Sequence, residues 1–136
     1  MRYSLGVLMA AVAVFSAQAV YACKCAVPPP PKKALEQATA VFLGKVTEIE
    51  KKGHRVHVTF EVSTAYKGVK AKSVTVTTGM GGGDCGIRFT KGEVYVVYCH
   101  ISGKGKPLST GSCSRTRAAS KAKEDIEALG KATAIG

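Results

Sequence analysis

Two cysteines separated by one residue, Cys23 and Cys25, stand directly behind an apolar leader, and they constrain this chain more than any other feature of its sequence. The leader has a basic residue at Arg2 and an almost unbroken apolar run from Leu5 to Phe15, which is typical of a secretory signal peptide. This run is shorter than the roughly 20 apolar residues that a membrane-spanning helix needs. We therefore expect residues 1–22 to be a signal peptide and the rest of the chain to be exported.

The position of the cut decides which residue begins the exported chain. Val20 and Ala22 are small residues at the two positions that a signal peptidase inspects, so we expect a cut after Ala22. The mature chain then begins with Cys23, and its free α-amine, its carbonyl and its thiol lie at one point. Two alternatives stay open: a cut after Ala19, and attachment of a lipid to Cys23, although Tyr21 fits a lipoprotein signal poorly. In each case the predicted location is extracellular or periplasmic.

All the cysteines of the chain lie after the expected cut. They are Cys23, Cys25, Cys85, Cys99 and Cys113. Because an exported chain meets an oxidising compartment, we expect disulfide bonds. Five cysteines give two bridges and one free thiol as the simplest arrangement, and the spacing alone leaves the pairing open.

The charge of the chain favours anionic partners without naming one. Without Arg2, 19 basic residues face 9 acidic ones in a mature chain of 114 residues (136 less 22), which is enough for one domain with a modest core. The lysines are scattered and form no dense run. We therefore predict a basic, soluble surface with no dedicated nucleic-acid site, on a protein that is a monomer.

Apolar residues that alternate along short segments predict a mostly β domain. The expected strands are residues 41–49, 56–62, 73–78, 94–100 and 108–113, and the expected helices are residues 32–38 and 118–129. The segment 94–100 is apolar on both faces, so we expect it to be central in a sheet or part of a barrel. Five short strands with two small helices favour a closed five-stranded barrel of the oligonucleotide/oligosaccharide-binding (OB) type, and a sandwich is the alternative.

The sequence carries no pattern that is typical of catalysis. It has no evident set of Ser, His and Asp and no evident pair of carboxylates. Cys-x-Cys is not the redox motif Cys-x-x-Cys, and the run from Gly81 to Asp84 lacks the Lys-Ser/Thr of a phosphate-binding loop. We therefore expect a binding protein, not an enzyme, with no intrinsic cofactor.

Several short motifs occur in an order that is informative as a set. They are Cys23-Lys24-Cys25 with Ala26-Val27-Pro28-Pro29, Phe42-Leu43-Gly44-Lys45-Val46, Tyr66-Lys67-Gly68, Cys85-Gly86, Lys91-Gly92-Glu93, and Leu108-Ser109-Thr110 with Cys113. This ordered set resembles the N-terminal, netrin-like domain of the tissue inhibitors of metalloproteinases. The whole pattern looks like the shorter bacterial members, which carry only that domain. The resemblance implies that residues 23–136 form one netrin-like domain of the OB type.

The resemblance also implies a disulfide pairing and a function. The implied bridges are Cys23–Cys85 and Cys25–Cys113, and Cys99 is left as a free thiol. The residues expected to enter the active site of a zinc metalloproteinase are Cys23, Lys24, Cys25, Ala26, Val27 and Pro28. In the family, the amine and the carbonyl of the first residue bind the zinc of the protease and displace its water, which here implies Cys23.

Four features depart from the family. Lys24 stands where the family usually has a small polar residue, and an ammonium that is buried without a partner is costly. The bridge that ties the early helix of the animal domain to its end is missing, and so is the C-terminal domain. Cys99 matches no bridge of the family, and its apolar neighbours indicate a buried, inert thiol, with a mixed disulfide or a dimer as the alternative. The alternative function is an exported OB-type binding or structural module of the cell envelope that inhibits no protease.

Overall fold

The computed structural model describes residues 23–130 and 133–134. Its first elements are α1 (Pro31–Gln37), β1 (Ala40–Lys52), β2 (Arg55–Lys67), β3 (Ser73–Thr78) and β4 (Val94–Cys99). They are followed by β5 (Arg117–Ala118), the 3₁₀ turn η1 (Ala119–Lys121), α2 (Lys123–Leu129) and β6 (Thr133–Ala134). The expected signal peptide, residues 1–22, lies outside the described residues.

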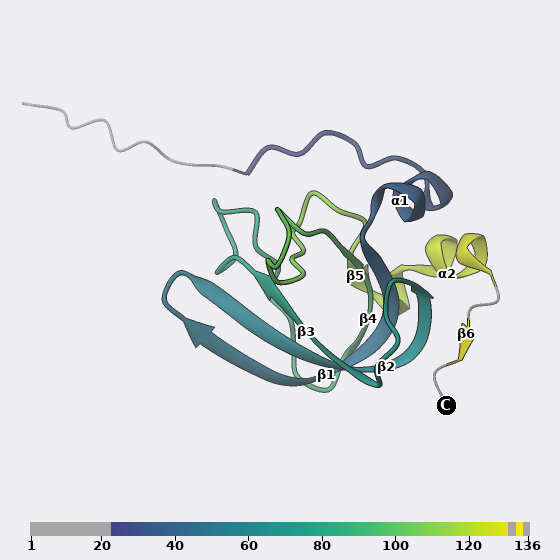
Figure 1. The fold of residues 1–136 in the computed structure, drawn as a ribbon. Coiled ribbons are helices and arrows are strands. Elements are labelled where there is room, and N and C mark those ends of the chain that lie inside the picture. Colours follow the sequence, from purple (N-terminus) through teal and green to yellow (C-terminus); the bar gives the residue numbers. More distant parts are fainter. Residues whose placement is uncertain (1–22, 131–132, 135–136) are drawn as a thin grey trace, which may run out of the picture.

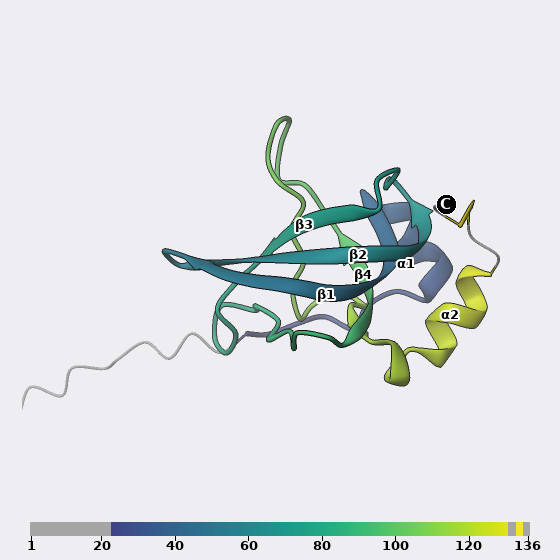
Figure 2. The ribbon, with the colours of Figure 1, turned by 90° about the horizontal axis from the view of Figure 1, so that it is seen from below.

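The strands form one antiparallel sheet in the order β3-β2-β1-β4-β5, and the two-residue β6 pairs with β2 beside this path. Both helices lie at one end of the sheet, and the tip of the β1–β2 hairpin projects at the opposite end (Figure 1). The view in Figure 2 shows the same separation from below. The sequence-based prediction of a mostly β domain with two short helices is therefore confirmed.

The predicted closure into a barrel is wrong, because the sheet is open. The expected last strand, residues 108–113, makes only isolated bridges, in which Ser109 pairs with Thr77 on one side and His100 on the other. After Thr110 the chain turns, and the N–H of Ser114 donates to the carbonyl of Gly111 at 3.1 Å. This turn carries Cys113 to its disulfide partner, so the segment cannot continue as a ladder beside β3.

The other predicted elements differ from the structure mainly in their bounds. The hairpin of β1 and β2 is confirmed and is longer than predicted, with Gly53 at a φ of 61° in its turn. The helix expected over residues 118–129 is confirmed only for Lys123–Leu129. Arg117 and Ala118 pair with β4 instead, because Ala118 lies opposite Tyr95 in an antiparallel register.

Strand β4 is buried on both faces, as its apolar sequence predicts. Tyr95, Val97 and Cys99 point into a core that is enclosed by the curved sheet. Val96 and Tyr98 point the other way, into a second core that is covered by helices α1 and α2. One short strand therefore takes part in both hydrophobic cores.

The larger core is organised by four aromatic rings. Phe60 is fully buried and lies edge-on to Phe42 and to Phe89, with 5.3 Å between the ring centroids in each pair. Phe89 also lies edge-on to Tyr95 at 4.7 Å. Such edge-to-face pairs add to the free energy gained from burial, so this cluster links β1, β2 and β4 to the loop before β4.

Helix α1 joins the N-terminal segment (residues 23–30) to the sheet. Pro31 occupies its first turn, where the missing N–H leaves no acceptor unsatisfied. At its other end, the ammonium of Lys67 donates to the carbonyls of Leu35 and Glu36 at 3.0 and 2.9 Å. A cation at the C-terminus of a helix stabilises it, so β2 fixes the position of α1 directly.

We predict that Phe60→Ala lowers the free energy of unfolding by about 3–5 kcal/mol, because it removes the central ring of the aromatic cluster. Urea denaturation of the oxidised protein measures this loss. Ile49→Ala, at a position on the same hairpin that is 39% exposed, is the matched control and should change stability by less than about 1 kcal/mol. Equal losses in the two variants would contradict a core centred on Phe60.

Candidate functional site

Two disulfide bonds join the N-terminal segment to two separate loops. Cys23 is bonded to Cys85 and Cys25 to Cys113, with Cα–Cα distances of 5.1 and 5.0 Å. These are the pairs that the resemblance implies. Because they span 62 and 88 residues, they fix the beginning of the described chain to its middle and to its last third.

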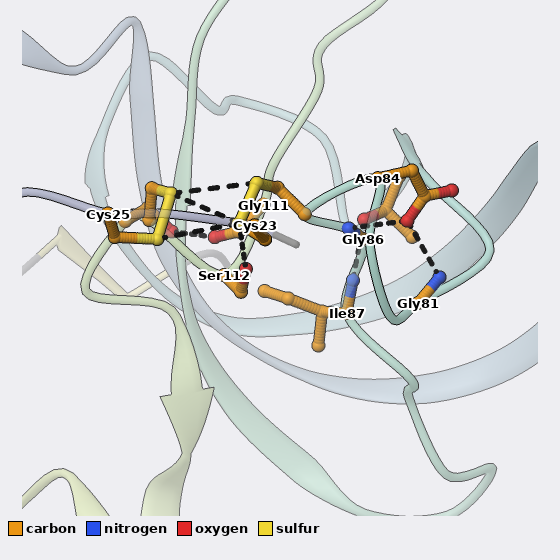
Figure 3. The surroundings of a disulfide bond; sticks show 12 residues. Cys23, Cys25, Gly81, Asp84, Gly86, Ile87, Gly111 and Ser112 are labelled. Atoms are coloured by element: carbon orange, nitrogen blue, oxygen red, sulfur yellow. Dashed lines mark hydrogen bonds between the residues drawn. A yellow bond between two sulfur atoms is a disulfide. The ribbon is translucent and has the colours of Figure 1, made fainter. Parts of the chain in front are cut away.

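The two bridges lie against each other (Figure 3). The Sγ atom of Cys23 is 3.7 Å from that of Cys25 and 3.6 Å from that of Cys113, and Cys113 and Cys85 are 3.8 Å apart at their Sγ atoms. Bonded sulfurs carry no hydrogen, so these are van der Waals contacts. All four sulfurs lie within 4.8 Å of one another, but a metal needs thiolates, and these cysteines are oxidised.

The loop that holds Cys85 is a compact turn around the carboxylate of Asp84. The backbone N–H groups of Met80, Gly81 and Gly86 donate to it at 2.6, 3.1 and 2.9 Å. The hydrogen bonds from Gly86 and Met80 lower the pKa of Asp84 below its ordinary value. The glycine-rich stretch before Cys85 therefore has a defined conformation.

Cys85 itself connects the two bridged loops. It has a φ of 59°, in the left-handed region that residues with side chains rarely adopt. Its carbonyl accepts a hydrogen bond of 2.8 Å from the N–H of Ser112, which precedes Cys113. The disulfides, Asp84 and this backbone bond together make one rigid support beneath the first residues.

The residues that the sequence assigns to the site lie along this support and face solvent. Cys23 is half-buried, whereas Lys24, Cys25 and Ala26 are exposed. Val27 is 92% exposed, which is unusual for an apolar side chain, and Pro28 is half-buried. Lys24 thus has an exposed side chain and stands between two cysteines, each of which forms a disulfide with a different loop.

A buried ion pair lies behind the N-terminal segment. The guanidinium of Arg115 donates to the carboxylate of Asp125 through Nε at 2.6 Å and through Nη2 at 3.2 Å, and Asp125 is fully buried. The hydroxyl of Tyr98 donates to the same carboxylate at 2.8 Å. A third nitrogen of Arg115, Nη1, donates to the carbonyl of Pro29 at 3.3 Å, so the pair reaches the N-terminal segment.

The protonation of this group follows from its contacts. Burial alone raises the pKa of Asp125, but the hydrogen bonds from Arg115 and Tyr98 outweigh it and hold the pKa below the ordinary value. Burial, followed by the bond to Asp125, raises the pKa of the Tyr98 hydroxyl. At neutral pH the group therefore contains an ionised carboxylate, a guanidinium and a neutral phenol.

Sequence reasoning missed this network. Arg115 and Asp125 stand ten residues apart in segments that have no common period, and only the fold brings Tyr98 to them. The turn around Asp84 was within reach, because an aspartate in a glycine-rich run commonly accepts nearby backbone N–H groups.

Cys99 is fully buried in the larger core and is the free cysteine of the described chain. Burial raises the pKa of its thiol to about 12, because the thiolate would lose its hydration. This environment fits the predicted inert thiol.

Comparisons with known proteins do not assign the chain to a family. No family model matches the sequence, and no curated protein matches it. Within residues 23–130 and 133–134, no helix has the length and apolar character needed to cross a membrane.

We predict that native protein does not react with iodoacetamide at pH 8, and that one thiol per chain reacts after unfolding in denaturant without reductant. With a pKa of about 12, only about one thiol in ten thousand is ionised at pH 8, and the thiol is also enclosed. Intact mass counts the added groups. Cys99→Ser should add none in either state, and rapid labelling of the native chain would contradict the buried position.

We also predict that Asp125→Asn lowers the free energy of unfolding by about 3–5 kcal/mol at pH 7, because it leaves Arg115 buried without its anion. The folded pKa of Asp125 lies below the unfolded one, so its contribution is present above about pH 4 and is lost as the pH falls through the folded pKa. Denaturant titrations between pH 7 and pH 2 should therefore show wild type and variant converging in acid.

The matched control for this experiment is Glu124→Gln. Glu124 also contacts Arg115, at 3.1 Å, but its side chain is 73% exposed, so its loss should change stability by less than about 1 kcal/mol. A difference between wild type and Asp125→Asn that stays constant down to pH 2 would contradict the ionised pair.

Proposed function

We propose that this protein is an exported inhibitor of zinc metalloendopeptidases and acts through a mature N-terminus at Cys23. The observation that carries the proposal is the geometry of residues 23–27. Two disulfides fix Cys23 and Cys25 to the body of the protein, while Lys24, Ala26 and Val27 are exposed. The protein binds its target rather than catalysing a reaction, and its partner is a protease with an accessible catalytic zinc.

The chemistry needs a ligand pair that replaces the zinc-bound water. A catalytic zinc has three protein ligands and one open position, which water occupies. After a cut before Cys23, the α-amine and the carbonyl of that residue are close enough to bind the same ion together. An α-amine has a pKa of about 7.7–8.0, so a substantial fraction is unprotonated and able to bind a metal near neutral pH.

The rigidity of the N-terminal segment supports this mechanism as much as its zinc-binding groups do. A flexible N-terminus would lose conformational entropy on binding, and a preorganised one loses less. Here the first and third residues of the predicted mature chain are both disulfide-bonded, and the loop behind them is ordered by Asp84. The segment thus enters a cleft with little further ordering.

Lys24 selects the kind of protease. Its side chain would point toward the first pocket on the primed side of the cleft, where an ammonium needs either water or an acid as its partner. We therefore propose a target whose first primed pocket is acidic or open to solvent, and not the usual animal matrix enzymes.

A resemblance of the fold to the OB type is part of the same proposal. Strands β1, β2 and β3 form a meander, β4 returns to pair with β1, and Ser109 bridges β3 and the end of β4. This arrangement supports the resemblance to the netrin-like domain even though the sheet is open.

We predict that the chain beginning at Cys23 inhibits at least one zinc metalloendopeptidase with an acidic or open first primed pocket, and that one extra alanine before Cys23 weakens inhibition by about 100-fold or more. The extension turns the amine into an amide that cannot ligate zinc, and a loss of about 2.7 kcal/mol corresponds to this factor. Inhibition constants for the two proteins against a panel of such proteases are the measurement.

The design requires both proteins to have the same disulfides and the same unfolding midpoint, which intact mass and denaturant titration establish. Equal potency of the extended protein would overturn the zinc-directed mechanism. Absence of inhibition by both proteins across the panel would overturn the inhibitor proposal and favour an envelope binding or structural module.

A further inference from the structure

The N-terminal segment is held at a second place besides its disulfides. Ala26 and Val27 are exposed, and the prolines that follow have no N–H to donate. Across the described ranges, 23–130 and 133–134, residues 26–29 make one hydrogen bond to the rest of the protein, which is the bond from Nη1 of Arg115 to the carbonyl of Pro29. The position of this stretch therefore depends on few contacts.

Packing does not replace the missing hydrogen bonds. A surface pocket of about 130 Å³, partly open to solvent, lies beside the stretch, and Pro28, Pro29, Tyr98, Cys113 and Arg115 are among the residues that line it. Side chains that line such a pocket face solvent on that side and are not packed against other side chains there. Pro28 and Pro29, which are both half-buried, thus pack against the body on part of their surface only.

Arg115 is well suited to fix it, because its own position is fully determined. Its side chain is 9% exposed, and Nε and Nη2 both donate to Asp125, which Tyr98 also holds. A guanidinium is planar, so two occupied nitrogens set the direction of the third. That third nitrogen is Nη1, and it points to Pro29.

The two attachments come from one short loop. Cys113 forms a disulfide with Cys25. Arg115, two residues later, donates a hydrogen bond to the carbonyl of Pro29. The stretch from Cys25 to Pro29 is therefore held at both of its ends by residues 113–115, with the exposed Ala26 and Val27 between them.

We propose that Arg115 is a positioning residue for the N-terminal segment, and that Asp125 in α2 and Tyr98 in β4 act through it. Arg115 sets the direction in which residues 24–27 leave the surface. It needs no contact with the target, because it acts through the carbonyl of Pro29. The ordering of Ala26 and Val27 is a property of this chain alone, whereas its effect on inhibition rests on the proposed function.

The test is Arg115→Lys in the oxidised protein that begins at Cys23. A lysine keeps the charge and one bond to Asp125, but it lacks the planar fork that also reaches Pro29. We expect ¹⁵N relaxation to show the order parameters of Ala26 and Val27 falling from about 0.85 to below about 0.6. Inhibition of a protease that the wild type inhibits should weaken about tenfold, because the segment must then be ordered on binding.

Two matched variants separate positioning from stability. Glu124→Gln removes the charge of the exposed partner of Arg115 and leaves the bonds to Asp125 and Pro29, so the order parameters should stay unchanged. Val46→Ala is a change in the larger core, away from Arg115 and Pro29, and it should lower the unfolding midpoint while Ala26 and Val27 stay ordered.

The outcomes distinguish the two proposals. Unchanged order parameters in Arg115→Lys, or an equal loss of order in Val46→Ala, would overturn the positioning role whatever the inhibition assay gives. Loss of order in Arg115→Lys alone supports the role, and it does so even if the wild type inhibits no protease, in which case only the proposed function fails.

Discussion

The fold depends on the double burial of strand β4. Its side chains alternate between the core inside the curved sheet and the core beneath the two helices, so neither core is complete without it. The strand also supplies Tyr98, whose hydroxyl donates to Asp125 of α2 at 2.8 Å. The six residues of β4 therefore connect the sheet to helix α2 both by hydrophobic contact and by a hydrogen bond.

The N-terminal segment is attached to this frame by bonds of different kinds. Disulfides hold Cys23 and Cys25, a charge-assisted hydrogen bond from Arg115 reaches Pro29, and helix α1 begins at Pro31. A disulfide restricts the unfolded chain as well as the folded one, whereas the bond from Arg115 exists only when the buried ion pair has formed. The order of the first residues is thus tied to the folding of the C-terminal third.

Much of this fold was readable from the sequence, and the reasons for the exceptions are physical. The apolar alternation in β2 and the continuous apolar run of β4 were sufficient to predict both strands. The end of regular pairing within residues 108–113 did not follow from the apolar alternation, because the chain turns after Thr110 where Cys113 meets Cys25. A local pattern cannot carry information about a partner 88 residues away.

The candidate site also has one part that could be predicted from the sequence and one part that could not. The exposed stretch around Lys24 followed from the spacing of Cys23 and Cys25 together with the resemblance. The buried pair of Arg115 and Asp125 did not, because charged residues are normally expected at the surface and no spacing rule joins these two.

The enclosure of Cys99 has a consequence for oxidative maturation. A chain with five thiols can form many wrong pairs, and a thiol that the core encloses is withdrawn from exchange. Cys99 lies opposite Ala40 in the ladder between β1 and β4, so this withdrawal happens when that ladder forms. If the sheet assembles before oxidation, four thiols stay accessible and only three pairings are possible. By enclosing Cys99, the central strands thus reduce the number of wrong disulfides that can form.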